Sequence, residues 1–70
     1  MGTVHAFYDV TITRDRRGEK AEVQARTARA GKWLCEYLIV TVDNIVTVSQ
    51  DAIPEIEEAA RAAGLTVEIR

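Results

Sequence analysis

The chain has one histidine, His5, and one cysteine, Cys35, and these side chains are the first candidates for chemistry. His5 and Asp9 lie four residues apart in a stretch with strand-like alternation, which predicts a separation of about 13 Å. That distance is too long for a hydrogen-bonded acid–base pair. Cys35 lies beside Leu34 in a helix-like stretch, where a cysteine usually acts as a small packing residue. We therefore predict no catalytic residue and no enzyme activity.

The residue types also predict no metal and no cofactor. One cysteine and one histidine cannot form an internal disulfide or, by themselves, a structural zinc site. Glu55, Glu57 and Glu58 form an acidic cluster, but a metal site needs several converging oxygens held by a shaped loop. A position near the positive end of a helix dipole, with pairing of Glu57 to Arg61 one turn later, explains this cluster without a metal.

The length and composition are typical of one globular domain spanning residues 1–70, with 47% hydrophobic and 29% charged residues. A chain of this size buries only about 60% of its unfolded surface, so a partner subunit is one source of extra stability. The sequence has no basic segment followed by an apolar core at its start, and no apolar run of about 20 residues. We expect a cytoplasmic protein with no membrane partner.

Charge is distributed unevenly along the chain, although the net charge is only −2. Residues 1–35 carry seven basic and four acidic side chains, whereas residues 36–70 carry two basic and seven acidic ones. This asymmetry favours electrostatic steering to a partner or head-to-tail self-association, and two solvated faces are the simpler alternative. The basic side chains concentrate around the first predicted turn, at Arg14, Arg16, Arg17 and Lys20. Contact of these four residues with nucleic-acid phosphates is an alternative prediction.

Two stretches of period-two alternation, residues 4–12 and 20–26, predict an antiparallel hairpin whose turn contains Gly18. Placing Arg14 opposite Glu19 aligns apolar residues with apolar ones. The predicted inward pairs are Ile12 with Ala21, Val10 with Val23 and Tyr8 with Ala25.

The same register places Phe7 opposite Arg26 on the outer face of the hairpin. An outward phenylalanine lowers solubility unless it is covered, and an aromatic side chain beside an arginine is typical of protein interfaces. Stacking of Arg26 on Phe7 within the chain is the simpler alternative. We predict a partner-binding set that combines this pair with the acidic cluster, namely Phe7, Arg26, Glu55, Glu57 and Glu58.

Two helices are predicted from capping residues and apolar periodicity. Thr27 caps the first, over residues 28–38, and Ser49 or Asp51 caps the second, which ends before Gly64. The inward side chains of the first helix are Ala30, Leu34, Tyr37 and Leu38. The apolar stripe of the second helix is Ile53, Ile56, Ala60 and Ala63.

The run from Leu38 to Val48 is the densest in Leu, Ile and Val, and we expect it to supply the buried strand against which the domain packs. Two layouts fit this run. Either residues 40–42 and 45–48 form a hairpin, or the helix exits through residues 39–43 and a single strand covers residues 44–49. We prefer the single strand because it gives simpler connections.

Residues 65–70 alternate once more and predict a final strand. The resulting order, ββαβαβ, predicts an α+β fold with a small mixed sheet and two helices packed on one face. The rule of right-handed crossovers predicts that the strands over residues 44–49 and 65–70 are parallel and close together.

A hairpin followed by ARTARAGKWLCEYL, a short strand VTVS and the stretch AAGLTVE resembles the small uncharacterised α/β proteins of bacteriophages and other mobile elements. Small anti-CRISPR proteins are similar in size, acidity and absence of catalytic motifs. The resemblance implies an accessory protein that occupies a surface of a host factor.

We therefore predict a non-enzymatic protein-binding module, and hypothesise a phage-encoded inhibitor that occludes a surface of a host defence complex of the CRISPR type. Its expected partner is a host protein or a ribonucleoprotein complex. One alternative is a small nucleic-acid-binding protein that uses the basic hairpin. The other is a structural homo-oligomer joined through the Phe7 face or an open sheet edge.

Overall fold

The computed structural model describes residues 8–38 and 44–70 of the chain. Its elements follow the predicted ββαβαβ order, which confirms the α+β class. They are β1 (Val10–Arg14), β2 (Lys20–Ala25), α1 (Ala28–Leu38), β3 (Ile45–Ser49), a 3-10 turn (Gln50–Ala52), α2 (Ile53–Ala62) and β4 (Val67–Ile69).

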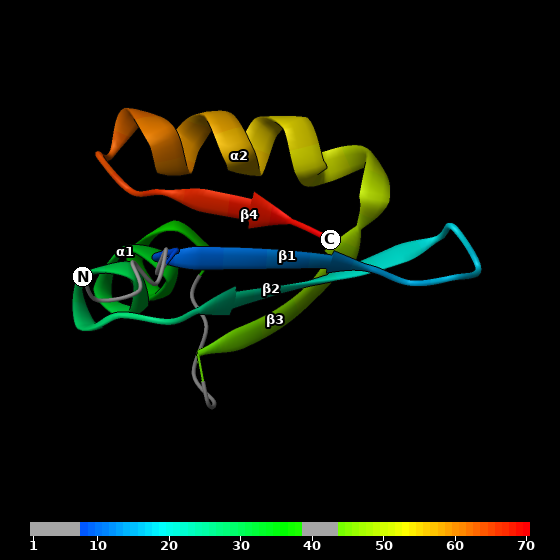
Figure 1. The fold of residues 1–70 in the computed structure, drawn as a ribbon, viewed down its shortest axis with the longest axis horizontal. Helices are drawn as coiled ribbons and strands as arrows, with labels where there is room; N and C mark the ends of the chain where they lie inside the picture. The colour runs from blue at the N-terminus through cyan, green and yellow to red at the C-terminus, as the bar shows by residue number, and fades with distance from the viewer. Residues whose placement is uncertain (1–7, 39–43) are drawn as a thin grey trace, which may run out of the picture.

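The four strands form one mixed sheet in the order β3-β2-β1-β4 (Figure 1). β1 pairs with β2 and β2 with β3 in antiparallel fashion, whereas β1 and β4 are parallel. β3 and β4 therefore run in the same direction, as predicted. They lie at opposite edges of the sheet, however, because the β1–β2 hairpin is inserted between them, so the prediction that they are close together is wrong.

The register of the β1–β2 hairpin differs by two residues from the prediction. Ile12 lies opposite Val23 and Val10 opposite Ala25. The turn is closed by Asp15 and Lys20 instead of Arg14 and Glu19, because the Asp15 N–H donates to the Lys20 carbonyl at 2.9 Å. A shift of two residues keeps every side chain on its own face, so the alternation in the sequence cannot distinguish the two registers.

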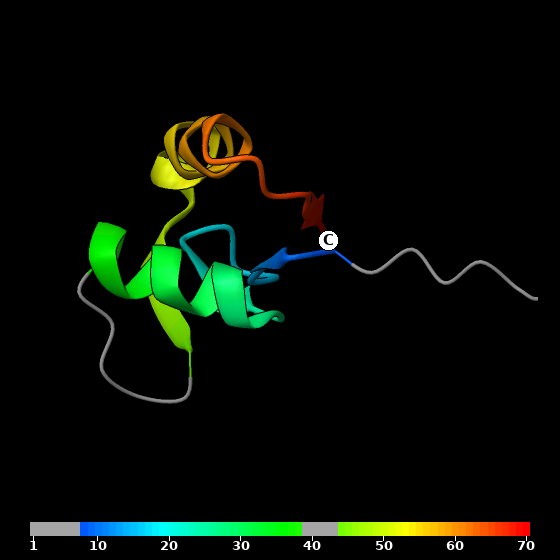
Figure 2. The same ribbon diagram turned by 90° about the vertical axis from the view of Figure 1, so that its left-hand side faces the viewer.

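Both helices pack on one face of the sheet, as predicted, because residues of both join a single core with the inward side chains of β1 and β2. Figure 2, which looks along the strands, shows α2 end-on and α1 crosswise. The buried core consists of Val10, Ile12, Ala21, Val23, Ala25, Ala30, Leu34, Ile53, Ile56, Ala60, Leu65 and Val67.

The centre of the sheet is formed by β1 and β2, whereas Ile45–Val48, the strand part of the Leu38–Val48 run that the structure describes, belongs to the edge strand β3. Val10 and Ile12 of β1 are completely buried, whereas β3 lies at an edge and its residues alternate between exposed and half-buried. Richness in β-branched residues predicts a strand but does not predict its place in a sheet. A strand covers Ile45–Ser49, as both layouts predict, and the choice between them depends on residues 39–43, which lie outside the described residues.

Helix α1 has the predicted bounds, and the Ala30 N–H donates to the Thr27 hydroxyl at 3.2 Å, which confirms the N-cap. Two expectations about its faces are wrong. Tyr37 is 38% exposed and stacks on Trp33 with ring centroids 5.2 Å apart, instead of entering the core. Cys35 is exposed and does not act as a packing residue. The buried stripe of α1 consists of Ala30, Gly31 and Leu34, and both Cys35, which follows Leu34, and Tyr37, three positions after it, lie outside this stripe.

Helix α2 is preceded by the 3-10 turn, whose Asp51 N–H donates to the Ser49 hydroxyl at 3.3 Å. Ile53, Ile56 and Ala60 are buried as predicted. Ala63 is exposed, because the helix ends at Ala62 and Ala63 is its C-cap.

Gly64 ends this helix with a φ of +81°, in the left-handed region that the prediction requires. The chain then folds back, so that the Leu65 N–H donates to the Ala60 carbonyl at 3.0 Å and the Leu65 side chain is buried. The final strand covers only Val67–Ile69 and is shorter than predicted.

We expect Gly64→Ala to lower the free energy of unfolding by about 1 kcal/mol, because an L-residue is strained at this positive φ. Gly64→Asn is the control, and its loss should be smaller because asparagine tolerates the left-handed conformation. Urea denaturation of both variants measures the difference. Equal losses would argue against a conformational cause.

Candidate functional site

Asp9, which the sequence placed on an outer strand face, is only 5% exposed and is surrounded by hydrogen-bond donors. Its Oδ1 accepts from the Thr27 hydroxyl at 2.7 Å and from Arg29 Nε at 3.0 Å. Its Oδ2 accepts from Arg29 Nη2 at 2.7 Å and from the Thr66 N–H at 3.0 Å. Both oxygens are therefore occupied, which suits a structural carboxylate better than a catalytic base.

The Asp9 contacts join three parts of the fold. Thr27 is the N-cap of α1, Arg29 belongs to its first turn, and Thr66 lies between α2 and β4. The backbone takes part as well, since the Asp9 N–H donates to the Thr66 hydroxyl at 2.9 Å and the Arg26 N–H donates to the Asp9 carbonyl at 2.7 Å. We call Asp9, Thr27, Arg29 and Thr66 the Asp9 junction.

The donors around Asp9 also determine its ionisation. The guanidinium of Arg29, followed by the Thr27 hydroxyl and the Thr66 N–H, holds the pKa of Asp9 well below its ordinary value, although burial acts in the opposite direction. Asp9 in turn raises the pKa of Arg29 through their hydrogen bond and the attraction of opposite charges. The sequence carried no signal for this junction, because Asp9 and Thr66 are 57 positions apart.

The acidic cluster lies on α2, where its three members have different surroundings. Arg61, the only basic residue of α2, donates from Nη2 to the Glu57 carboxylate at 2.8 Å, which confirms the predicted pair. Glu55 and Glu58 are exposed. In the part of the chain that the structure describes, neither of them forms an ion pair or a side-chain hydrogen bond. Two uncompensated carboxylates therefore remain on the outer side of α2.

The basic residues lie on the hairpin that joins β1 and β2, whose tip projects at one end of the molecule (Figure 1). The side chains of all four predicted phosphate-binding residues are exposed, namely Arg14, Arg16, Arg17 and Lys20. Arg14 is directed toward β4, since its Nε donates to the Arg70 carbonyl at 3.4 Å. Asp15 and Glu19 lie in the same turn and reduce its net positive charge.

The basic hairpin and the start of α2 lie at the same end of the molecule (Figure 1). Gln50 joins them, because its side-chain amide donates to the carbonyls of Asp15 and Lys20, each at 3.1 Å. The charge asymmetry of the sequence therefore does not place a positive and a negative pole at opposite ends of the fold. The hairpin and α2 are adjacent surfaces of opposite charge.

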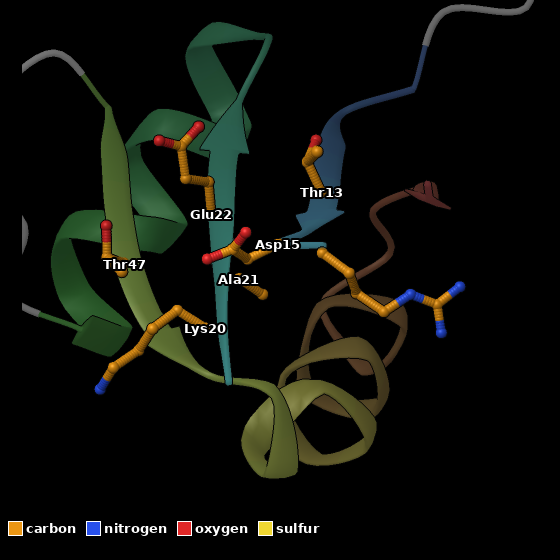
Figure 3. Close-up of a pocket in the computed structure, with 7 residues that line it drawn as sticks. Thr13, Asp15, Lys20, Ala21, Glu22 and Thr47 are labelled. Carbon is orange, nitrogen blue, oxygen red and sulfur yellow. The ribbon is translucent and has the colours of Figure 1, made fainter. Parts of the chain in front are cut away.

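A shallow hollow of about 270 Å³ lies at the base of the hairpin (Figure 3). Glu22 stands between Thr13 and Thr47 of the two neighbouring strands, and Arg14, Asp15 and Lys20 complete the charged part of the rim. Carboxylates, a guanidinium group and an ammonium group thus share one small opening, and this mixture favours no class of ligand. Within residues 8–38 and 44–70, no three His, Cys, Asp or Glu side chains converge as a metal site.

The structure describes only one residue of the predicted pair of Phe7 and Arg26. Arg26 is exposed, but it lies opposite Asp9, so its predicted position opposite Phe7 is wrong because of the two-residue shift in register. Phe7 and His5 lie outside the described residues. The structure places Glu55, Glu57 and Glu58 on α2, and Arg26 in the connection between β2 and α1.

No protein-family model, curated protein or solved structure matches this chain. Among the described residues, no helix is both long enough and apolar enough to span a membrane.

Replacement of the junction carboxylate by Asp9→Asn should lower the free energy of unfolding at neutral pH by about 2–4 kcal/mol, because the donors of Thr27, Arg29 and Thr66 lose their charged, buried acceptor. The matched control is the exposed Asp51→Asn, for which we expect little change.

The pH dependence gives an independent check on the same carboxylate. Its folded pKa lies below the unfolded value of about 3.9, so its contribution is complete above that value and is lost as pH falls below about 4. Urea denaturation at several pH values should show a steeper acid loss for the wild type than for Asp9→Asn. Parallel losses in the two proteins would contradict this role of Asp9.

Proposed function

We propose that this protein is a non-enzymatic binding module whose helix α2 docks on a basic surface of a partner protein. The observation that carries the proposal is the pair of exposed carboxylates, Glu55 and Glu58, which has no compensating cation among the described residues. Like charges three positions apart on a helix are mildly destabilising. A partner that supplies arginine or lysine side chains would remove this cost.

The dipole of α2 accounts for only part of its negative charge. Glu55 lies in the first turn, where a carboxylate is favourable, and Glu57 is neutralised by Arg61. Glu58 lies beyond the first turn, where the dipole effect has faded. Its charge is therefore not explained by the stability of the isolated chain.

The position of α2 suits a docking role. Its inner side is anchored by Ile53, Ile56 and Ala60, and its outer side is directed away from the sheet (Figure 2). A rigid helix presents its carboxylates at fixed spacing, which favours fast, electrostatically steered association with a complementary surface. The basic grooves of nucleic-acid-handling proteins are surfaces of this complementary charge. A helix bound in such a groove would inhibit the partner by occluding the groove.

The test compares Glu55→Gln/Glu58→Gln with the matched control Glu19→Gln/Glu22→Gln, which removes two exposed carboxylates from the hairpin instead. The tagged proteins are used to capture partners from nuclease-treated bacterial lysate, and association with the captured partner is followed at increasing salt. The α2 variant should associate more slowly and with a weaker salt dependence, while the control binds like the wild type. Unchanged kinetics in the α2 variant would rule out docking through α2.

A second candidate function, nucleic-acid binding, is favoured by the projecting hairpin. Its exposed arginines can reach a phosphate backbone without interference from the helices (Figure 1). The acidic residues Asp15 and Glu19 in the same turn weaken the attraction, which is why we place this function second.

Under this second function, the protein should be retained on a DNA or RNA column, and retention should fall steeply with salt. Arg16→Ala/Arg17→Ala should lose retention, whereas Arg61→Ala, on α2, should keep it. A wild-type protein that passes through the column at low salt would exclude this candidate.

A further inference from the structure

The two edges of the sheet are built differently. β4 has only three residues, and Glu68 pairs with Arg70 at 3.1 Å, so this edge is short and charged. β3 has five residues, IVTVS, with no charge, no proline and no glycine. Short strands and charged side chains are the usual means of preventing edge-to-edge association. β4 has both features, and β3 has neither.

The backbone groups on the outer side of β3 can be assigned from its pairing with β2. The Ala25 N–H donates to the Asn44 carbonyl at 2.9 Å, and the Gln50 N–H donates to the Glu19 carbonyl at 3.1 Å. In an antiparallel ladder, residues alternate between bonding inward and pointing outward. Val46 and Val48 therefore bond to β2, and the N–H and C=O groups of Ile45, Thr47 and Ser49 point away from the sheet, where no strand within residues 8–38 and 44–70 pairs with them.

We propose that β3 pairs with β3 of a second copy of this chain, antiparallel, about a two-fold axis through Thr47. In this register Thr47 faces Thr47 of the second copy, Ile45 faces Ser49, and Val46 faces Val48. Every outward-pointing backbone group of Ile45 and Thr47 then meets another outward-pointing group. The two sheets become one continuous eight-stranded sheet, twice the four strands of a single chain.

A second copy fits this edge because β3 is complementary to itself. On the helix side, the half-buried Val46 and Val48 pack against the equivalent valines, so four side chains at the margin of two thin cores become central in one. On the opposite side, Ile45, which is 38% exposed, gains cover from the neighbouring strand. No charged residue of β3 opposes another, so nothing on the strand resists pairing.

The proposed pairing leaves α2 accessible. α2 lies beside β4, at the edge of the sheet furthest from β3 (Figure 1). The dimer would therefore carry two acidic helices on its outside. Self-association through β3 does not depend on the docking function of α2.

Sedimentation of the full chain at increasing concentration tests the pairing, with an expected mass of twice 7.8 kDa. In the proposed dimer, Thr47→Lys places two lysines directly opposite each other, and Thr47→Glu places two glutamates there. Because like charges repel, either variant alone should stay at the mass of one chain. A mixture of the two variants should recover the double mass, because lysine then faces glutamate. The control is Thr13→Lys, which replaces an exposed threonine of β1 on the same face of the sheet as Thr47. This variant should remain dimeric.

Circular dichroism of each variant verifies that the loss of mass is not a loss of fold. Amide hydrogen exchange adds a local readout, since the N–H groups of Ile45 and Thr47 should be protected in the wild type and exposed in Thr47→Lys. Three results would overturn the proposal: a wild-type mass of one chain at every concentration, a Thr47→Lys variant that keeps the double mass, or a mixture that fails to recover it. The first of these would leave the edge to a strand from a different protein.

Discussion

The interaction on which the rest of the structure depends is the set of hydrogen bonds to the buried carboxylate of Asp9. Four of the twelve buried core residues are alanines, namely Ala21, Ala25, Ala30 and Ala60, and their small side chains make few contacts that could orient the neighbouring elements. Directional bonds from Thr27, Arg29 and Thr66 supply what the alanines cannot. They set the first turn of α1 and the entry to β4 relative to the first residues of β1.

The sheet order separates the two surfaces that matter for association. Because the β1–β2 hairpin occupies the centre of the sheet, β3 and β4 lie at opposite edges, and α2 lies beside β4 (Figure 1). The uncharged edge and the acidic helix are therefore independent of each other. The proposed pairing through β3 and the proposed docking of α2 therefore use opposite sides of the domain.

The sequence predicted those features that depend on local chemistry. Thr27 as a cap, Gly64 at a positive φ and the alternation of Lys20–Ala25 are each decided by a few neighbouring residues, and each is confirmed. The hairpin register was wrong because alternation has a period of two and cannot detect a shift of two. The edge position of β3 and the burial of Asp9 depend on partners distant in the chain, which no local pattern reports. Glu55 and Glu58 are exposed on α2, and Phe7 lies outside the described residues.

The parallel pairing of β1 with β4 has a consequence for the order in which the fold can form. Val10 aligns with Val67, and Asp9 contacts Thr66 across 57 positions. β1 therefore acquires β4 as its second neighbouring strand only when the chain has reached these C-terminal residues. Bringing together residues so far apart in sequence lowers the conformational entropy of the chain before the contacts add any stability. Such contacts therefore slow folding. During synthesis, the hairpin and α1 emerge well before Thr66 exists. For that interval Asp9 holds its charge without the donor from the α2–β4 connection, and one edge of β1 stays open to water.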